Sequence, residues 1–227
     1  MTLTDPATHQ TLGELTYLRL RADIISCRLL PGQKLRLEAL REHYDVGVST
    51  LREILSRLAS DSLVVAEGQK GFAVAPATAK DLHEVADLRL LLETHALRLS
   101  LANGDLDWEG RVVAAHHKLA ATEKRLLAGQ EKHTVNWVRY DFAFHNALIS
   151  ACNSHALLDL HAATFDRFMR YHMLAVSFRG AGVVDDHRAL FDLAMARDVE
   201  GALAMLATHV GRGVTHVLGT GKLDTHA

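Results

Sequence analysis

Cysteine and proline are both scarce in this sequence of 227 residues, which has two cysteines and three prolines. Cys27 and Cys152 lie too far apart in the chain for a disulfide framework or a cysteine-based zinc motif, and they fit small buried hydrophobic residues of a reducing compartment. Because β-branched residues are also few beside Ala and Leu, the composition predicts a mainly α-helical protein.

Long apolar runs and an excess of one charge are missing as well. No window approaches 18 uncharged apolar residues, which argues against a membrane-spanning helix. The start of the chain has no basic segment followed by an apolar one, so we expect no secretory signal and a cytoplasmic protein. Lys and Arg number 25 against 27 Asp and Glu, and the resulting net charge of −2 shows no global positive field toward nucleic acid.

Histidine, in contrast, is abundant, with 15 residues against seven phenylalanines and four tyrosines. Imidazole is the commonest metal ligand among side chains, so this composition directs attention to a metal site. Hydrophobic residues make up 48% of the chain and charged residues 23%, which permits a normal buried core and excludes wholesale disorder.

The sequence pattern changes near Pro76. This proline ends a predicted strand, and Thr78 can cap a helix that begins at Ala79. We therefore predict two domains, residues 1–76 and residues 77–227.

The first domain is predicted to contain three helices and then a β-hairpin. The expected helices are Leu12–Cys27, Leu37–His43 and Ser49–Ser60, and the expected strands are Leu63–Val65 and Phe72–Val74. Ser49 is the expected N-cap of the third helix. The apolar face predicted for the first helix consists of Leu12, Leu15, Leu18, Ala22 and Ile25. Three helices, a tight turn before the third and a terminal hairpin are typical of a winged helix-turn-helix.

The third of these helices carries groups suited to duplex DNA at its N-terminal end. Hydroxyls and the helix N-terminus can hold phosphates, and Arg52 can donate two hydrogen bonds to a guanine edge. The expected DNA-binding residues are Ser49, Thr50, Arg52, Arg57, Gln69, Lys70 and Gly71. The alternative is a small helical domain that covers the core, with Arg52 in a surface ion pair. Residues 1–76 hold nine basic and nine acidic residues, so DNA binding requires the positive charge to gather on one face.

The segment Asp45–Leu58, with Leu30-Pro31-Gly32 before it and Glu67–Phe72 after it, resembles the GntR family of bacterial transcription regulators. Val48 and Thr50 replace residues that are common in the family. A DNA contact is therefore carried over by the resemblance to Arg52 alone.

The rest of the chain resembles the all-helical, metal-binding effector domain (FCD) of the family's FadR-type branch, nearest to the carbon-starvation-type regulators. The residues that carry this resemblance are Arg89 and Glu93, Asp141–His145, Asp186–Leu190 and His209. It implies a homodimer that binds operator DNA and responds to a small effector.

Six helices are predicted after Pro76. They cover about 79–103, 106–128, 134–152, 154–178, 183–197 and 199–218, separated by glycine-containing segments. Such an all-α six-helix bundle can enclose a ligand between facing helices.

Four potential metal ligands lie on apolar-lined faces of three of these helices. Asp141 and His145 are four residues apart and project side by side, and His187 and His209 follow on the last two helices. One carboxylate and three imidazoles suit zinc first, with nickel or another divalent first-row ion as alternatives. The competing interpretation is that each histidine is a hydrogen-bonded core residue. The histidines at 116, 117, 155, 161, 172 and 216 are interpreted as surface or packing residues.

Arg89 lies one helical turn before Glu93. The two could form a surface ion pair, or Arg89 could turn inward and bind a carboxylate effector held by the metal. The resemblance favours the inward orientation.

The sequence therefore predicts a DNA-binding transcriptional regulator, more plausibly a repressor, controlled by a small organic acid at the metal site. The alternative from another class is a metalloenzyme that uses the Asp/His site. Against it, the sequence has no separate general base or nucleophile at a recognisable spacing. A third interpretation is a purely structural metal with constitutive DNA binding.

Overall fold

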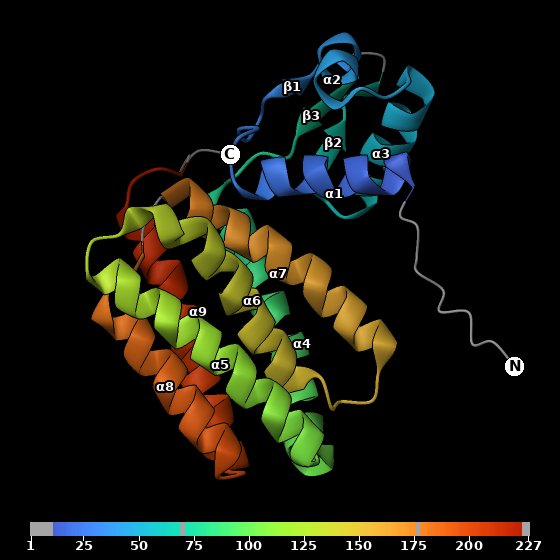
Figure 1. Ribbon diagram of the computed structural model, residues 1–227. Helices are drawn as coiled ribbons and strands as arrows, with labels where there is room; N and C mark the ends of the chain where they lie inside the picture. Colours follow the sequence, from blue (N-terminus) through green and yellow to red (C-terminus); the bar gives the residue numbers. More distant parts are fainter. Residues whose placement is uncertain (1–10, 69–70, 176–177, 224–227) are drawn as a thin grey trace, which may run out of the picture. The chain divides into compact units, whose positions relative to one another are not determined.

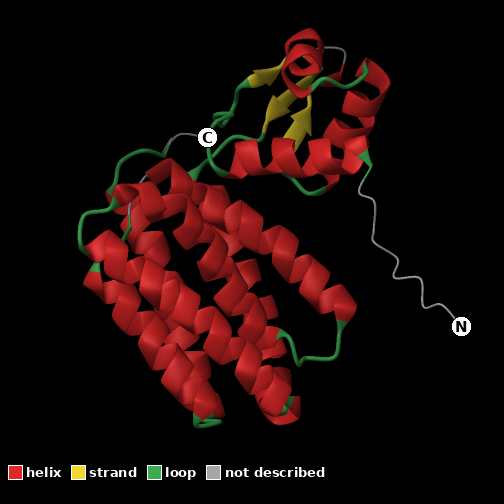
Figure 2. Ribbon diagram, viewed as in Figure 1, coloured by secondary structure: helices red, strands yellow, loops and turns green. Residues whose placement is uncertain are grey.

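The computed structural model describes residues 11–68, 71–175 and 178–223. It confirms a mainly helical chain with one small sheet, as the colouring by secondary structure shows (Figure 2). Contacts between Cα atoms divide the chain into two compact units, Met1–Pro76 and Ala77–Ala227. None of the described helices combines the length and the apolar character needed to cross a membrane.

The N-terminal unit is a winged helix-turn-helix (Figure 1). Its elements are α1 (Leu12–Ile25), β1 (Lys34–Leu35), α2 (Leu37–Tyr44), α3 (Val48–Ser60), β2 (Val64–Ala66) and β3 (Phe72–Val74). Strand β3 lies in the middle of the antiparallel sheet, with Ala73 opposite Lys34 on one side and Val65 on the other. The sequence did not predict β1, because two residues are too few for a period-2 pattern.

The buried face of α1 differs from the predicted one. Leu12 and Leu15 are 62% and 44% exposed, whereas Leu20 and Ile24 are fully buried. Apolar residues form two stripes along this helix, and their periodicity does not show which of the two is buried. The stripe that contains Tyr17 is the buried one. The Tyr17 hydroxyl donates a 2.7 Å hydrogen bond to Asp61 at the end of α3.

The N-cap of α3 also differs from the prediction. The helix begins at Val48, and its N-cap is Gly47, which has no side chain with which to cap it. Ser49 is the second residue of the helix and is exposed. The first turn therefore lacks a capping side chain, which leaves its backbone N–H groups available to an anion.

The C-terminal unit is an all-helical bundle. Its elements are α4 (Ala79–Asn103), α5 (Leu106–Leu127), the short 3₁₀ helix η2 (Glu131–His133), α6 (Thr134–Ile149), α7 (His155–Ala175), α8 (Ala181–Met195) and α9 (Val199–Gly219). The six long helices are those expected from the sequence, with ends that differ by a few residues. Side-chain caps begin four of them, at Thr78, Asp105, Ser154 and Asp198.

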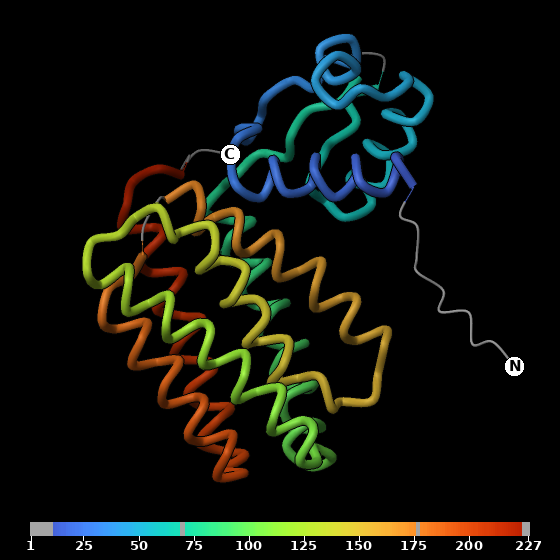
Figure 3. Tube along the Cα trace, in the orientation of Figure 1, coloured from blue at the N-terminus to red at the C-terminus, as the bar shows by residue number. Residues whose placement is uncertain are grey.

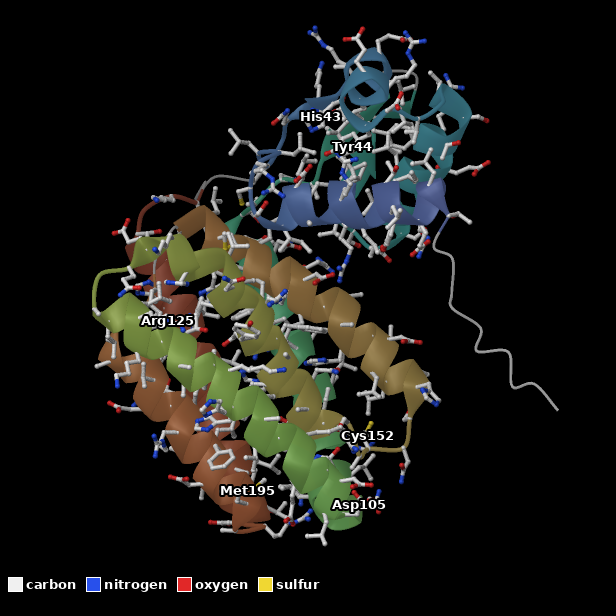
Figure 4. The ribbon with its side chains drawn as sticks, viewed as in Figure 1. His43, Tyr44, Asp105, Arg125, Cys152 and Met195 are labelled. Atoms are coloured by element: carbon white, nitrogen blue, oxygen red, sulfur yellow. The ribbon has the colours of Figure 1, made fainter. Side chains whose placement is uncertain are left out.

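The bundle consists of long helices that pack antiparallel to their neighbours, as the Cα trace shows (Figure 3). Helix α4 packs against α7 and α9, α5 packs against α6, and α8 packs against α9. Asp105 and Arg125 lie at opposite ends of the bundle, so α5 runs along its length (Figure 4). Large side chains are buried near the end of the bundle that holds Asp105. Trp108 is one of them, and its Nε1–H donates to the Leu148 carbonyl at 3.1 Å.

Candidate metal centre and nucleic-acid interface

The structure brings the four predicted metal ligands together inside the bundle. Asp141 and His145 lie one turn apart on α6, His187 comes from α8 and His209 from α9. All four are buried, and one ligand atom from each lies within 4.8 Å of the others. Sequence spacing supplied the pair on α6, and the packing of α8 and α9 supplies the other two.

Two of these histidines present Nδ1 to a buried carboxylate. His145 Nδ1 is in short contact with Glu93 Oε1 on α4, and His187 Nδ1 lies 2.7 Å from Glu123 Oε1 on α5. A carboxylate at Nδ1 assigns the proton of the neutral ring to that nitrogen and leaves the Nε2 lone pair for a metal. Glu123 also accepts a hydrogen bond from Trp137 Nε1 at 3.3 Å, which holds it in place.

The third histidine, His209, also has a carboxylate near Nδ1, but at a longer distance. His209 Nδ1 lies 3.6 Å from Asp186 Oδ2 and 3.3 Å from a terminal nitrogen of Arg179. The other oxygen of Asp186 forms a short ion pair with Arg212. Asp186 thus contacts two arginines as well as the histidine.

The Nε2 atoms of His145 and His187 are buried and have no hydrogen-bond partner among the described residues. Asp141 Oδ1 lies 3.0 Å from His187 Nε2, close but without the alignment of a hydrogen bond. Buried polar atoms without partners are rare and costly, and a metal ion is a group that nitrogen lone pairs and a carboxylate would satisfy together. The donor set, one carboxylate and three imidazoles, fits a first-row divalent ion.

The electrostatics of this cluster fit the same use. Burial alone would raise the pKa of Asp141 and lower that of His187. The close contact of the two groups outweighs burial, together with Glu123 in the case of His187, so the pKa of Asp141 is about 2 and that of His187 is about 9. Burial lowers the pKa of His145 and holds that of His209 well below its usual range. In the metal-free protein one proton on His187 therefore balances Asp141, and a metal ion would replace that proton.

Arg89 is buried, with 1% of its surface exposed, so the surface ion pair is wrong. Its Nε donates to Glu93 Oε2 at 2.8 Å, and another nitrogen lies 3.2 Å from His145 Nδ1. The guanidinium also lies over the rings of Phe165 and Phe168, 4.3 and 4.7 Å from their centroids. Arg89 turns inward as the resemblance implies, but its guanidinium already contacts Glu93 and the two aromatic rings.

A small cavity adjoins the ligand cluster, with a volume of about 10 Å³, the space of a single water molecule. Asp141 and His209 line it together with Arg89, Trp137, Phe168, Met169, His172, Arg179, Val183 and Gly213. The sequence pattern assigns no role to Glu123 or to Arg179, which lies in one of the glycine-containing segments between predicted helices. His172, interpreted as a surface or packing residue, is buried beside the cavity.

The predicted DNA-binding residues of α3 have different surroundings. Arg52 and Ser49 are exposed at the N-terminal end of the helix, Thr50 is partly buried, and no described carboxylate pairs with Arg52. Arg57, near the other end, pairs with Glu14 at 2.8 Å and lies 3.8 Å over the ring of Tyr17, which links α3 to α1.

The remaining predicted DNA contacts belong to the loop between β2 and β3. Gln69 and Lys70 lie outside the described residues. Gly71 has a φ of +92°, a backbone conformation that favours glycine in a tight loop.

Positive side chains gather around a hollow of about 790 Å³ between α1, β1 and α2. Those that line it are Arg19, Arg28, Lys34 and Arg36. One acidic residue, Asp23, shares the lining and pairs with Arg28. Basic charge is therefore segregated in this unit despite its balanced composition. His43 and Tyr44 mark α2 in Figure 4.

Comparison with known proteins assigns both units. Residues 12–74 match the gntR family of bacterial regulatory proteins, and residues 84–212 match the FCD domain. The HTH-type transcriptional regulator BphR of Paraburkholderia xenovorans is 38% identical over 94% of this chain and 88% of its own length. The HTH-type transcriptional repressor GlaR of Escherichia coli is 32% identical over 86% of this chain and 90% of its own length.

Solved structures show the same fold. Escherichia coli McbR/YncC superposes with a TM-score of 0.77 at 20% identity, over 92% of this chain and 98% of its own. A putative GntR regulator from Rhodococcus sp. RHA1 gives a TM-score of 0.74 at 25% identity, over 91% and 97% of the two chains. From the two domain matches and the full-length relatives, we conclude that this chain belongs to the GntR family of DNA-binding transcriptional regulators, with an FCD domain after its winged helix-turn-helix.

Proposed function

We propose that this regulator binds operator DNA as a homodimer, and that a small organic acid bound at a divalent metal in the helical bundle changes its DNA affinity. The observation that carries the proposal is that Asp141, His145, His187 and His209 lie close together inside the bundle. Two of the histidine Nε2 atoms in this group are buried and have no hydrogen-bond partner among the described residues. A repressor relieved by its effector is the proposed sign of regulation, and the relative GlaR is named a repressor.

Asp141, His145, His187 and His209 would hold the ion, and zinc is the first candidate for this donor set. When bound, the ion supplies a Lewis-acidic centre that binds a carboxylate oxygen. Glu93 and Glu123 orient two of the rings and keep their Nε2 atoms directed to the cluster. The carboxylate of the effector would lie beside the adjoining cavity, where a positively charged side chain can pair with it.

The DNA-binding part of the proposal rests on α3. Exposed Arg52 and the uncapped first turn of the helix combine a bidentate donor for a guanine edge with backbone N–H groups for a phosphate. Two copies of this unit in a symmetric dimer would bind two half-sites of a pseudo-palindromic operator. The effector can shift operator affinity only by its own difference in affinity for the two states of the dimer.

A metalloenzyme is the competing function. The Asp/His cluster with open coordination positions is compatible with it. The family and both curated relatives are transcription regulators, so we propose that the protein is not an enzyme. Turnover of an organic acid by the zinc-loaded protein would contradict this part of the proposal.

The test uses two variants that separate the two functions. His187→Ala combined with His209→Ala should abolish zinc binding in elemental analysis, because two of four ligands are removed. Arg52→Ala should retain zinc and weaken operator binding by about 1–3 kcal/mol in a mobility-shift assay, the usual cost of a lost bidentate base contact. Arg98→Ala, an exposed residue that pairs with Glu200 on the bundle, is the matched control for loss of one positive charge.

Retention of one zinc per chain by the double variant would refute the ligand set. Operator binding by Arg52→Ala equal to that of Arg98→Ala would remove Arg52 from the interface. Wild-type operator affinity that is unchanged by chelator and by every acid tested would leave DNA binding intact and refute the proposed regulation.

A further inference from the structure

We propose that Arg179 is the residue that binds the carboxylate of the effector, and that a small organic acid reaches it along the groove between α8 and α9. This inference rests on the proposed function and specifies which arginine recognises the acid and by which route the acid arrives. Neither the spacing of the sequence nor the matched domains assign a role to Arg179.

Arg89, the other arginine of the cavity, already has a close carboxylate partner. Its Nε is bound to Glu93 Oε2 at 2.8 Å, and the same carboxylate holds His145 through its other oxygen. Both partners are buried, with about 1% of their side chains exposed. A carboxylate that captured Arg89 would have to break this pair and release the ring of a metal ligand. Arg89 is therefore better suited to holding Glu93 than to binding an effector.

Arg179 is buried but only loosely bound. Its side chain is 9% exposed, and its Nε has no hydrogen-bond partner among the residues that the structure describes. Its terminal nitrogens lie 3.3 and 3.4 Å from Nδ1 and the carbonyl oxygen of His209. Its nearest carboxylate, Asp186, is 3.7 Å away and is already in a short ion pair with Arg212. A buried guanidinium whose one described ion pair is this long, and is shared with a second arginine, is incompletely compensated. A carboxylate is the ligand that its planar donors match.

The position of Arg179 joins two hollows of the bundle. Arg179 and Val183 line the small cavity beside the metal ligands, and both also line an open groove of about 540 Å³ between α8 and α9. The rest of the groove is formed by Gly182, Ala207, Thr208, Gly211, Arg212, Thr215 and His216. An acid in this groove would meet Arg179 before it meets His209, and its carboxylate could contact both the guanidinium and the metal.

The groove favours an anion over an uncharged ligand. Gly182, Ala207 and Gly211 are small, so they leave the groove open as far as Arg179. Arg212 lies at its outer side with 59% of its side chain exposed. We therefore expect small organic acids to bind and their uncharged amides to fail.

The experiment measures binding to zinc-loaded protein by isothermal titration calorimetry. The probes are acetate, butyrate, L-lactate and succinate, each compared with its amide. The wild type should bind at least one acid and none of the amides. Arg179→Gln should retain one zinc per chain by elemental analysis and weaken that acid by about 10- to 100-fold, the effect of losing a charge-assisted hydrogen bond. Arg179→Lys keeps the positive charge but not the planar pair of donors, so it should lose less affinity for the acid than Arg179→Gln does.

Arg98→Gln is the matched control, because it removes an exposed positive charge of the same bundle from a position outside both the cavity and the groove. It should change acid affinity by less than about threefold. Wild-type acid affinity in Arg179→Gln would overturn the role of Arg179 and leave the proposed function standing. Loss of zinc in that variant would also overturn it, since Arg179 would then support the ligand His209 instead. Failure of the wild type to bind any of the four acids would overturn both proposals.

Discussion

Each histidine of the cluster is accompanied by an acidic residue from another helix. Glu93 on α4 faces His145, Glu123 on α5 faces His187, and Asp186 lies near His209. A carboxylate at Nδ1 makes the ring a better ligand and fixes its orientation, so these acids act through the histidines. At the scale of single residues, Glu123 gives the clearest test, because its contacts are short and it lies outside the ligand set.

Glu123→Gln should keep the shape of the side chain but remove the charge beside His187. Zinc affinity is expected to fall by about 10- to 100-fold, as for other residues that orient metal ligands. Competition with a chromogenic chelator measures this change. Glu109→Gln on the same helix, where Glu109 pairs with Arg197 at 2.7 Å on the surface of the bundle, is the control and should bind zinc as the wild type does. Equal affinities in the two variants would contradict the role of Glu123.

His172 gives a prediction for pH. Burial, and then the charge of Arg179, lower the pKa of His172 to about 3, whereas an unfolded histidine titrates near 6.5. The fold therefore favours the neutral ring. Its contribution to stability is present above pH 6.5 and is lost as the pH falls from 6.5 toward 3.

Between pH 7.5 and pH 5.0 this group should remove about 2 kcal/mol from the free energy of unfolding. Urea unfolding of chelator-treated protein at the two pH values measures the loss. His172→Leu should lose about 2 kcal/mol less than the wild type over this interval. His117→Leu, at an exposed position on α5, should behave as the wild type. A parallel pH dependence for wild type and His172→Leu would refute the assignment.

Helix α1 shows what can be decided at the scale of one element. Its length and its N-cap Thr11 follow from local sequence, because the hydroxyl of Thr11 accepts from the Glu14 N–H at 3.2 Å. Which apolar stripe is buried does not follow, because two stripes have helical spacing. The choice depends on Tyr17 and Asp61, which are 44 positions apart.

The two stripes predict opposite effects for the same substitution. Leu20→Ala removes a fully buried side chain and should lower the free energy of unfolding by about 2–5 kcal/mol. Leu15→Ala, at a position 44% exposed, should change it by less than about 0.5 kcal/mol. Urea unfolding followed by circular dichroism compares them. A larger loss for Leu15→Ala would restore the stripe predicted from the sequence.

The proposed regulation concerns the whole molecule, because the Asp/His cluster and helix α3 lie in different units of the chain. A symmetric dimer reads a symmetric site, so duplexes selected from a random pool should contain an inverted repeat. Sedimentation of the complex should give two chains per duplex. Inserting about five base pairs between the half-sites should abolish tight binding, since one half-site is then turned by half a helical turn. A selected site without two-fold symmetry, bound by one chain, would refute the dimer.

The sequence by itself determined the helical class, the change of pattern near Pro76 and the identity of the four candidate ligands. These depend on local periodicity, on capping and turn residues, and on the chemistry of side chains one turn apart, such as Asp141 and His145. Only the tertiary structure decided the buried stripe of α1, the occupation of Arg89 by Glu93 and His145, and the positions of Glu123 and Arg179 beside the cluster. These features depend on which helices pack together. The free energy of such packing comes from contacts between residues far apart in the chain, and no local pattern records it.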